Sequence, residues 1–277
     1  MAKKAPVKPK PKVKPKVKPK PKMRPKDKVT KKKKIKPAIK WVFLNLVLIG
    51  AILALLLSPV FNIHDIVVGN NNKVETEDII SLSELETNTN MFKFLKLNVI
   101  NRIKQNAYIE EVKIKRSLPD KIIIDVVERI PTYMLSIGGI YAYINNQGYI
   151  LELSDEALEL LVISGYKTDK QDIKAGNRLN IEDLITLEKI IEITNISRNN
   201  GILDQVIEFK IEDNRLVLEL QNEKTAYIRD MANINIKIVT LRAILEREIN
   251  KAGEIFLDGM NEKDTVIFRE IGGSIYE

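Results

Sequence analysis

The sequence contains no cysteine and only one histidine, His64, among its 277 residues. Without cysteine the chain has no disulfide bonds, no thiolate nucleophile and no thiolate ligand for zinc. A zinc site with two histidine ligands is excluded by count alone. Any folded part of this chain must therefore be held together by its hydrophobic core.

Acidic residues are almost missing from the first 40 positions, which hold 19 Lys and Arg but a single acid, Asp27. The remaining positions hold 26 of the 45 basic residues and 36 of the 37 acidic residues. The net charge of +8 therefore combines +18 for residues 1–40 with −10 for the rest of the chain. The basic pI of about 9.3 describes the N-terminal tail, and the remainder is acidic.

Charge of either sign is missing between Lys40 and His64, and this gap contains the segment WVFLNLVLIGAILALLLSPVF, residues 41–61. Fourteen of its 21 residues are Val, Ile, Leu or Phe, and Asn45 is its single amide. A helix of this length spans roughly 30–35 Å, which is enough to cross the hydrocarbon core of a bilayer. The segment is therefore predicted to be a transmembrane helix.

Two other interpretations of residues 41–61 fit the sequence less well. A helix buried in a soluble core would show a polar face, and this segment is apolar all round. A cleaved signal peptide would have a shorter apolar run followed by an A-x-A-like site, whereas the exit here reads Leu57-Ser58-Pro59. For a retained helix, the positive-inside rule predicts a cytoplasmic N-terminus and an extracytoplasmic C-terminal part.

The basic tail, residues 1–40, contains the run KPKPKVKPKVKPKPK. Proline blocks helix and sheet hydrogen bonds, so the tail is predicted to be a disordered, extended coil. Because anionic lipid attracts lysine and tryptophan favours the interface, Lys36, Lys40 and Trp41 are predicted to contact the membrane surface. Specific nucleic-acid binding is not expected, because the tail has no aromatic or Gly/Arg pattern.

Residues 62–130 show the order strand, helix, helix, strand, strand. The first helix is expected to follow Thr76 as its cap. The second is expected around 98–106, with Leu97, Ile100 and Ile103 on one side. The last strand, KIIIDVVER, carries apolar residues on both faces, as an inner strand does. A small sheet backed by two helices is the economical packing of these elements.

Residues 131–270 indicate a second α+β domain with antiparallel hairpins, followed by a short tail, 271–277. Asn180 is expected to cap a long helix that ends near Arg198 and carries Leu184, Leu187, Ile190 and Ile191 on one face. A second amphipathic helix is expected over 234–250, with the buried stripe Ile238, Leu241, Ile244 and Leu245. Strands are expected near 140–152 as a hairpin and near 205–211, 215–220, 225–228, 254–258 and 265–269.

The sequence shows no constellation of catalytic residues, and no enzymatic activity, metal or cofactor is expected. The acid pair Glu110-Glu111 lies on an alternating strand, where neighbouring side chains point to opposite faces and cannot share a proton. The pair Gly138-Gly139 lies in a turn without the context of a phosphate-binding loop.

Several features in order resemble the FtsQ/DivIB family of bacterial cell-division proteins. A basic tail and one transmembrane helix precede FNIHDIVVGNN, at residues 61–71. YIEEVKIKRSLPDKIIIDVVERIP, at 108–131, is similar to the family's two strands joined by a Pro-Asp turn. IYAYINNQGYILE, at 140–152, is similar to the start of the family's second exported domain. The likeness covers about residues 41–270.

The resemblance implies a POTRA domain over 62–130, a β domain over 131–270 and no catalysis. It also implies a scaffold at the division septum that binds two small coiled-coil membrane proteins, FtsL and FtsB (called DivIC in Gram-positive bacteria). Through them it would help to regulate septal peptidoglycan synthesis. The alternative is a POTRA-bearing envelope translocation or assembly factor.

The last predicted strand is the candidate partner-binding site. A strand at a sheet edge exposes unpaired N–H and C=O groups, to which a partner strand can add. With the resemblance, this predicts that an FtsB/DivIC-like partner pairs with residues Thr265, Val266, Ile267, Phe268 and Arg269. The alternative is that Val266 and Phe268 simply belong to the core.

Overall fold

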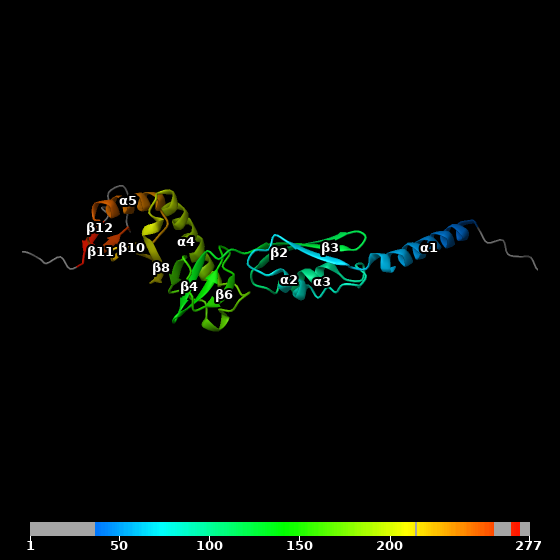
Figure 1. The fold of residues 1–277 in the computed structure, drawn as a ribbon. Coiled ribbons are helices and arrows are strands. Elements are labelled where there is room, and N and C mark those ends of the chain that lie inside the picture. The colour runs from blue at the N-terminus through cyan, green and yellow to red at the C-terminus, as the bar shows by residue number, and fades with distance from the viewer. Residues whose placement is uncertain (1–36, 214, 258–266, 272–277) are drawn as a thin grey trace, which may run out of the picture. The chain divides into compact units, whose positions relative to one another are not determined.

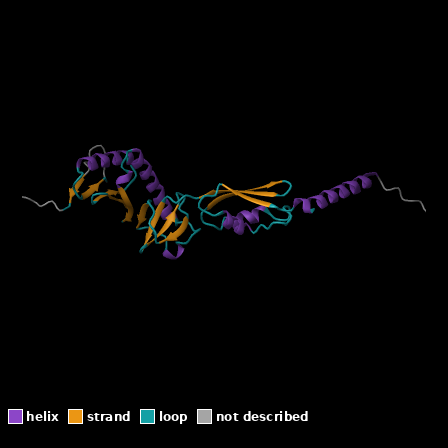
Figure 2. Cartoon of the chain, in the orientation of Figure 1, coloured by secondary structure: helices purple, strands orange, loops and turns teal. Residues whose placement is uncertain are grey.

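The computed structural model describes residues 37–213, 215–257 and 267–271. The chain divides into two compact units, residues 1–51 and 52–277. Figure 1 shows the elements in chain order, and Figure 2 separates helices from strands. The second unit contains two domains with separate cores, termed here the first domain (residues 62–130) and the second domain (residues 131–270).

Helix α1 is the predicted membrane helix, although it begins earlier and ends earlier than expected. It runs from Pro37 to Leu56 rather than over 41–61. Its window Ile39–Leu56 is long and apolar enough to cross a membrane and has no buried residue. The amide of Asn45 donates a hydrogen bond to the carbonyl oxygen of Trp41 at 2.8 Å, so this polar group is satisfied within the helix. The free energy cost of exposing such an apolar helix to water is removed when the helix lies in lipid.

The first domain packs two helices against one face of a three-stranded sheet (Figure 2). The strand order is β1-β3-β2, in which β3 pairs parallel with β1 and antiparallel with β2. The prediction of an inner strand at β3 is therefore confirmed. The elements after α1 are η1 (Pro59–Phe61), β1 (Asp65–Gly69), α2 (Thr76–Ser83), α3 (Lys96–Ile103), β2 (Ile109–Ser117) and β3 (Lys121–Glu128).

Two details of these helices differ from the sequence prediction. The cap of α2 is Glu75, and Thr76 is the first helical residue, whose hydroxyl oxygen accepts a hydrogen bond from Asn71. Helix α3 starts two residues earlier than expected and buries Val99 and Ile103. Leu97 is exposed, because it lies two residues from Val99 and so faces another side of the helix.

The second domain contains one sheet of nine described strands, in the order β12-β11-β10-β9-β8-β7-β4-β5-β6. Strands β5 and β6, β8 and β9, and β9 and β10 pair as antiparallel hairpins, and the α+β prediction is confirmed. The elements are β4 (Tyr133–Ile137), β5 (Ile140–Ile144), β6 (Ile150–Ser154), β7 (Leu161–Ser164), η2 (Lys170–Asp172), α4 (Ile181–Asn199), η3 (Leu203–Gln205), β8 (Val206–Glu212), β9 (Arg215–Leu220), β10 (Lys224–Ile228), α5 (Ile234–Arg247), β11 (Gly253–Phe256) and β12 (Ile267–Glu270).

Strands β4 and β7 lie in the middle of this sheet, although the sequence analysis did not predict them. Strand β7 pairs parallel with both β4 and β8 and so joins the two halves of the sheet. With four residues in β7 and five in β4, neither is long enough to show a clear alternation of polar and apolar residues. Their strand character depends on partners that are distant in sequence.

Helices α4 and α5 lie along one face of the sheet (Figure 1). The core of the domain lies between these helices and the sheet. Helix α5 buries Ile238, Leu241 and Ile244, three of the four residues predicted for its apolar stripe. Helix α4 buries Leu187 and Ile190 as predicted.

The start of α4 is fixed by a buried carboxylate. Asn180 caps the helix as predicted, because its Oδ1 accepts a hydrogen bond from the backbone N–H of Asp183 at 2.8 Å. Asp183 is only 4% exposed. Its carboxylate accepts hydrogen bonds from the backbone N–H groups of Lys167 and Thr168 and from the hydroxyl of Thr168. One side chain therefore joins the helix to the loop after β7.

Contacts within the second unit join the two domains. Leu151 on β6 is 2% exposed and belongs to the core of the first domain. The hydroxyl of Tyr108 donates a hydrogen bond to the carboxylate of Glu152 at 2.7 Å. The guanidinium of Arg129 lies 4.2 Å from the ring centroid of Tyr149, a distance typical of a cation–π contact. Burial, followed by the hydrogen bond to Glu152, raises the pKa of Tyr108 above its usual range.

The buried Asp183 network predicts a stability effect. Asp183→Ala leaves two backbone N–H groups without their acceptor, and we expect it to lower the free energy of unfolding by about 2–4 kcal/mol. Urea unfolding followed by circular dichroism measures this change. Glu182→Ala is the matched control, because it removes only an exposed ion pair to Lys167 and should unfold near the wild-type midpoint. Equal midpoints for the two variants would contradict the role assigned to Asp183.

A second prediction concerns pH and the start of α5. The ammonium of Lys237, whose side chain is 2% exposed, lies 2.8 Å from the carboxylate of Asp230. This hydrogen bond lowers the pKa of Asp230 below its ordinary value of 3.8. The pair therefore stabilises the fold above about pH 4, and its contribution is lost as the pH falls through the lowered pKa.

We expect Asp230→Asn to lower the unfolding midpoint at neutral pH and to approach the wild type as the pH falls below about 4. Urea midpoints measured across this pH range test the effect. Asp155→Asn, at an exposed position, is the control and should follow the wild type throughout. A difference between Asp230→Asn and the wild type that does not shrink in acid would contradict the assignment.

Candidate interaction edge at strand β12

Strand β12 forms one edge of the nine-stranded sheet and pairs antiparallel with β11. The N–H of Ile271 donates to the carbonyl oxygen of Ala252 at 3.1 Å, which makes these two residues a hydrogen-bonded pair. Because such pairs alternate along an antiparallel ladder, the backbone groups of Arg269 also face β11. The N–H and C=O groups of Phe268 and Glu270 then point away from it, toward a side where the sheet has no further described strand.

Phe268 attaches β12 to the core of the domain. Its side chain is partly buried and packs against the core cluster, and its register partner is the fully buried Ile255. The ring lies directly over Gly253, where an added Cβ would come within 2.6 Å of a ring carbon. A glycine is thus required at this position of β11 by close packing.

The opposite face of the sheet carries a ladder of polar side chains that ends at Arg269. The guanidinium of Arg269 forms an ion pair with Glu254 on β11. Glu254 also accepts a hydrogen bond from the hydroxyl of Tyr227 on β10 at 3.2 Å. Farther along, Thr225 donates to the carboxylate of Glu219 on β9 at 3.1 Å. The ladder holds the edge strand in register through charge as well as through its backbone.

The same contacts shift the titration of these groups. The hydrogen bond from Arg269 lowers the pKa of Glu254, and burial raises the pKa of Tyr227. The ring of Tyr227 stacks on Phe256 with centroids 5.0 Å apart, and the guanidinium of Arg269 lies 5.2 Å from the Phe256 ring. Arg269 is therefore ordered by a carboxylate and by an aromatic face at once.

The structure describes only part of each set of predicted site residues. Ile267, Phe268 and Arg269 lie on β12, with Ile267 59% exposed and Phe268 turned to the core. Thr265 and Val266 lie outside the described residues, as does Lys36. Lys40 and Trp41 are exposed side chains of α1.

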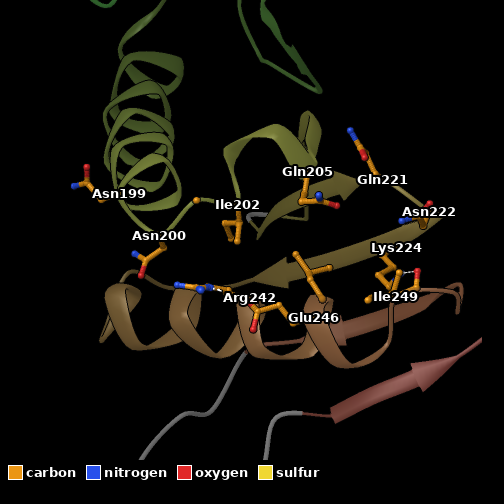
Figure 3. A pocket seen from close by; sticks show the side chains of 12 residues that line it. Asn199, Asn200, Ile202, Gln205, Gln221, Asn222, Lys224, Arg242, Glu246 and Ile249 are labelled. Atoms are coloured by element: carbon orange, nitrogen blue, oxygen red, sulfur yellow. Dashed lines mark hydrogen bonds and ion pairs between the residues drawn. The ribbon is translucent and has the colours of Figure 1, made fainter.

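A polar hollow of about 590 Å³ lies where the ends of α4 and α5 meet the β9–β10 turn (Figure 3). Lys224 at its wall is 1% exposed, and its ammonium donates to the carbonyl oxygen of Ile249 at 3.1 Å, just after α5. This contact gives the buried ammonium a backbone acceptor in the segment that follows α5, so the lysine has a structural role. The sequence analysis assigned no binding role to the carboxamide residues around it, which are Asn199, Asn200, Gln205, Gln221 and Asn222.

Within the described part of the chain, no group of three or more His, Asp or Glu side chains is placed to hold a metal ion. At the β12 edge, the available chemistry is backbone hydrogen bonding.

Comparison with known proteins shows the family. The family model described as "POTRA domain, FtsQ-type" matches residues 61–129. The cell division protein DivIB of Clostridium tetani is 32% identical over 208 residues, which cover 72% of this chain and 71% of the relative. DivIB of Clostridium botulinum strain Hall is 30% identical over 239 residues, which cover 83% of this chain and 91% of the relative. The chain belongs to the FtsQ/DivIB family of cell-division proteins.

The resemblance seen in the sequence is therefore confirmed, and the first domain is a POTRA domain of the FtsQ type. An N-terminal apolar helix in a protein of this family also supports a single-pass membrane protein. Among solved structures, the major extracytoplasmic domain of DivIB from Geobacillus stearothermophilus matches with 15% identity and a TM-score of 0.27. That match covers 44% of this chain and 98% of the solved chain.

The contact between Gly253 and Phe268 predicts how β12 can be detached. Gly253→Ala places a methyl group against the Phe268 ring and the carbonyl oxygen of Arg269, so the edge strand must move away. We expect faster amide hydrogen exchange in residues 267–270 and unchanged protection in β8 and β9.

Gly69→Ala is the matched control for this measurement. Gly69 also lies in a strand, but an added Cβ meets only one side-chain atom, 3.4 Å away on Asp125. It should leave exchange at 267–270 unchanged. Equal exchange in this segment for the wild type and Gly253→Ala would show that the glycine does not hold the edge.

Proposed function

We propose that this FtsQ/DivIB protein is a non-catalytic scaffold of the division machinery that captures small single-span membrane proteins at its β12 edge. The partners are FtsL-like and FtsB/DivIC-like proteins, and through them the scaffold helps to regulate septal peptidoglycan synthesis. The family supplies the role in cell division. The observation that carries the binding proposal is that β12 has no second strand neighbour among the described residues.

An added strand suits this edge for three reasons. The outward N–H and C=O groups of Phe268 and Glu270 supply the pairing positions of a new ladder. Ile267 is 59% exposed and Ile271 57% exposed, so apolar side chains flank those groups. Exposed edges with apolar side chains are prone to pair with another strand, and a dedicated partner would protect this one.

The proposed topology places the tail, residues 1–40, in the cytoplasm and both domains outside the membrane, at the division septum. The charge difference of +18 against −10 across α1 supports this orientation. Lys36, Lys40 and Trp41 would contact the cytoplasmic membrane surface, where anionic lipid attracts the basic tail. An envelope translocation factor, the alternative left open by the sequence, has no support from the named relatives, which are cell-division proteins.

The test is to purify the tagged full-length chain from membranes and to identify co-purifying proteins by mass spectrometry. We expect small single-span proteins with coiled-coil sequences. Their absence, with outer-membrane or secretion components in their place, would contradict the scaffold role.

Variants at the edge then test the site itself. Ile267→Glu puts a charge beside the new ladder, and Phe268→Ala loosens the strand, so we expect each to weaken partner binding about tenfold or more, or at least about 1.4 kcal/mol. Ile236→Glu on α5 is the control, because Ile236 has a similar exposure of 54% but lies on a helix. Full partner binding by a folded Ile267→Glu protein would show that the partner uses another surface.

A further inference from the structure

Three leucines of the POTRA domain are far more exposed than its core residues. Leu95 is 69% exposed, Leu97 is 66% exposed and Leu118 is 61% exposed. Leu95 and Leu97 lie at the start of α3, and Leu118 lies in the turn between β2 and β3. Large apolar side chains that gather in one region of a soluble surface usually mark a binding surface.

Hydrogen bonds join the loop before α3 to the end of α1. The side-chain amide of Asn90 donates to the carbonyl oxygen of Leu56 at 3.0 Å and to that of Ser58 at 3.1 Å. The carbonyl group of Leu56, the last residue of α1, is one of those that a helix end leaves without a partner inside the helix. The N–H of Met91 also donates to the carbonyl oxygen of Phe61 at 2.9 Å. The loop that leads to Leu95 therefore starts at the membrane exit.

Arg116 on β2 holds the same loop from the other side. Its Nε donates to the carbonyl oxygen of Met91 at 2.8 Å, and its Nη2 donates to that of Phe94 at 3.0 Å. Its guanidinium lies 4.7 Å from the centroid of the Phe94 ring. Leu95 directly follows Phe94, and Leu118 lies two residues beyond Arg116. This clamp brings Leu95 and Leu118 into one region.

The turn that carries Leu118 is also joined to the membrane exit. The N–H of His64 donates to the carbonyl oxygen of Asp120 at 2.7 Å. On the other flank, the ammonium of Lys96 donates to the carbonyl oxygen of Ile114 at 2.7 Å, which fixes the first turn of α3 against β2. Both exposed segments are thus hydrogen-bonded to a framework that begins where α1 ends.

We propose that Leu95, Leu97 and Leu118 form a membrane-contacting foot, which inserts into the interface of the bilayer that α1 crosses. The end of a spanning helix lies near the headgroup region, so side chains bonded to it through one or two residues lie at that depth. Leucine gains free energy on leaving water for the boundary of the acyl chains. The exposed Lys93 in the same loop suits the phosphate groups of lipid headgroups.

The occupant is lipid because the segments that carry the three leucines are hydrogen-bonded to residues at the membrane exit. A protein partner would have to compete with the bilayer for this position. The inference concerns the POTRA domain and the membrane alone, so it holds or fails independently of the proposed partner at β12. It also explains why Leu97, expected in the core, is instead exposed.

The absence of cysteine makes a direct test possible. Single cysteines are placed at Leu95, Leu97 or Leu118 of the full chain and labelled with the environment-sensitive fluorophore NBD. The proteins are reconstituted into phosphatidylcholine vesicles with and without phosphatidylglycerol. We expect blue-shifted emission, quenching by nitroxide-labelled lipid and an iodide quenching constant roughly threefold or more below that of the controls.

Cysteines at Ile207 on β8 and Ile236 on α5 are the controls, because each residue is 54% exposed in the second domain. Their quenching also shows what fraction of the reconstituted molecules have the second domain outside the vesicle, in contact with added iodide. Iodide quenching at the three foot positions equal to that of the controls would overturn the proposal. Protection that appears only after a partner protein is added would overturn it as well, since the cover would then be protein.

A double substitution tests whether the leucines act together. Leu95→Asp with Leu97→Asp changes exposed positions, and circular dichroism checks that the fold is kept. With NBD at position 118, we expect this variant to restore iodide quenching to the level of the controls. Unchanged protection at position 118 in the folded variant would show that the foot does not hold the domain at the bilayer.

Discussion

The rest of this structure depends on one constraint: helix α1 has no polar face and no charge after Lys40, so it must be kept out of water. Such a helix is stable in the hydrocarbon of a bilayer, and this requirement separates a strongly basic tail from an acidic, folded part. Its last carbonyl groups still need hydrogen-bond donors. Asn90 of the POTRA domain donates to the carbonyl oxygen of Leu56, the last residue of the helix, so hydrogen bonds join the end of the helix to the start of the fold.

The second domain shows how a sheet edge is kept available without losing order. Strand β12 has one strand neighbour, yet Phe268 packs over Gly253 and Arg269 pairs with Glu254. These contacts use both faces of the strand, and its outer backbone groups meet no further strand within the described ranges. The strand is thus held in place while its outer backbone groups face away from the sheet. An edge that is already ordered suits binding, because little conformational entropy is lost when a partner binds.

Local signals in the sequence predicted the regular elements well where the pattern was long. The apolar residues on both faces of β3 indicated an inner strand, and the side chain of Asn180 indicated the start of α4. Short strands were missed, because β4 and β7 are defined by pairing with distant segments. Leu97 was predicted on the buried side with Ile103, and the structure exposes it, because Val99 and Ile103 define the buried face and Leu97 lies about half a turn from Val99.

By itself the sequence determined the membrane helix, the charge difference across it, the absence of disulfides, the α+β class and the family. These follow from composition, hydrophobic periods and short motifs, which are local properties of the chain. Only the tertiary structure decided that β12 lies at an edge, that Gly253 makes room for Phe268 and that Asn90 and Arg116 bring exposed leucines to the membrane exit. Each of these depends on contacts between residues far apart in sequence, and such contacts leave no periodic signal in the chain.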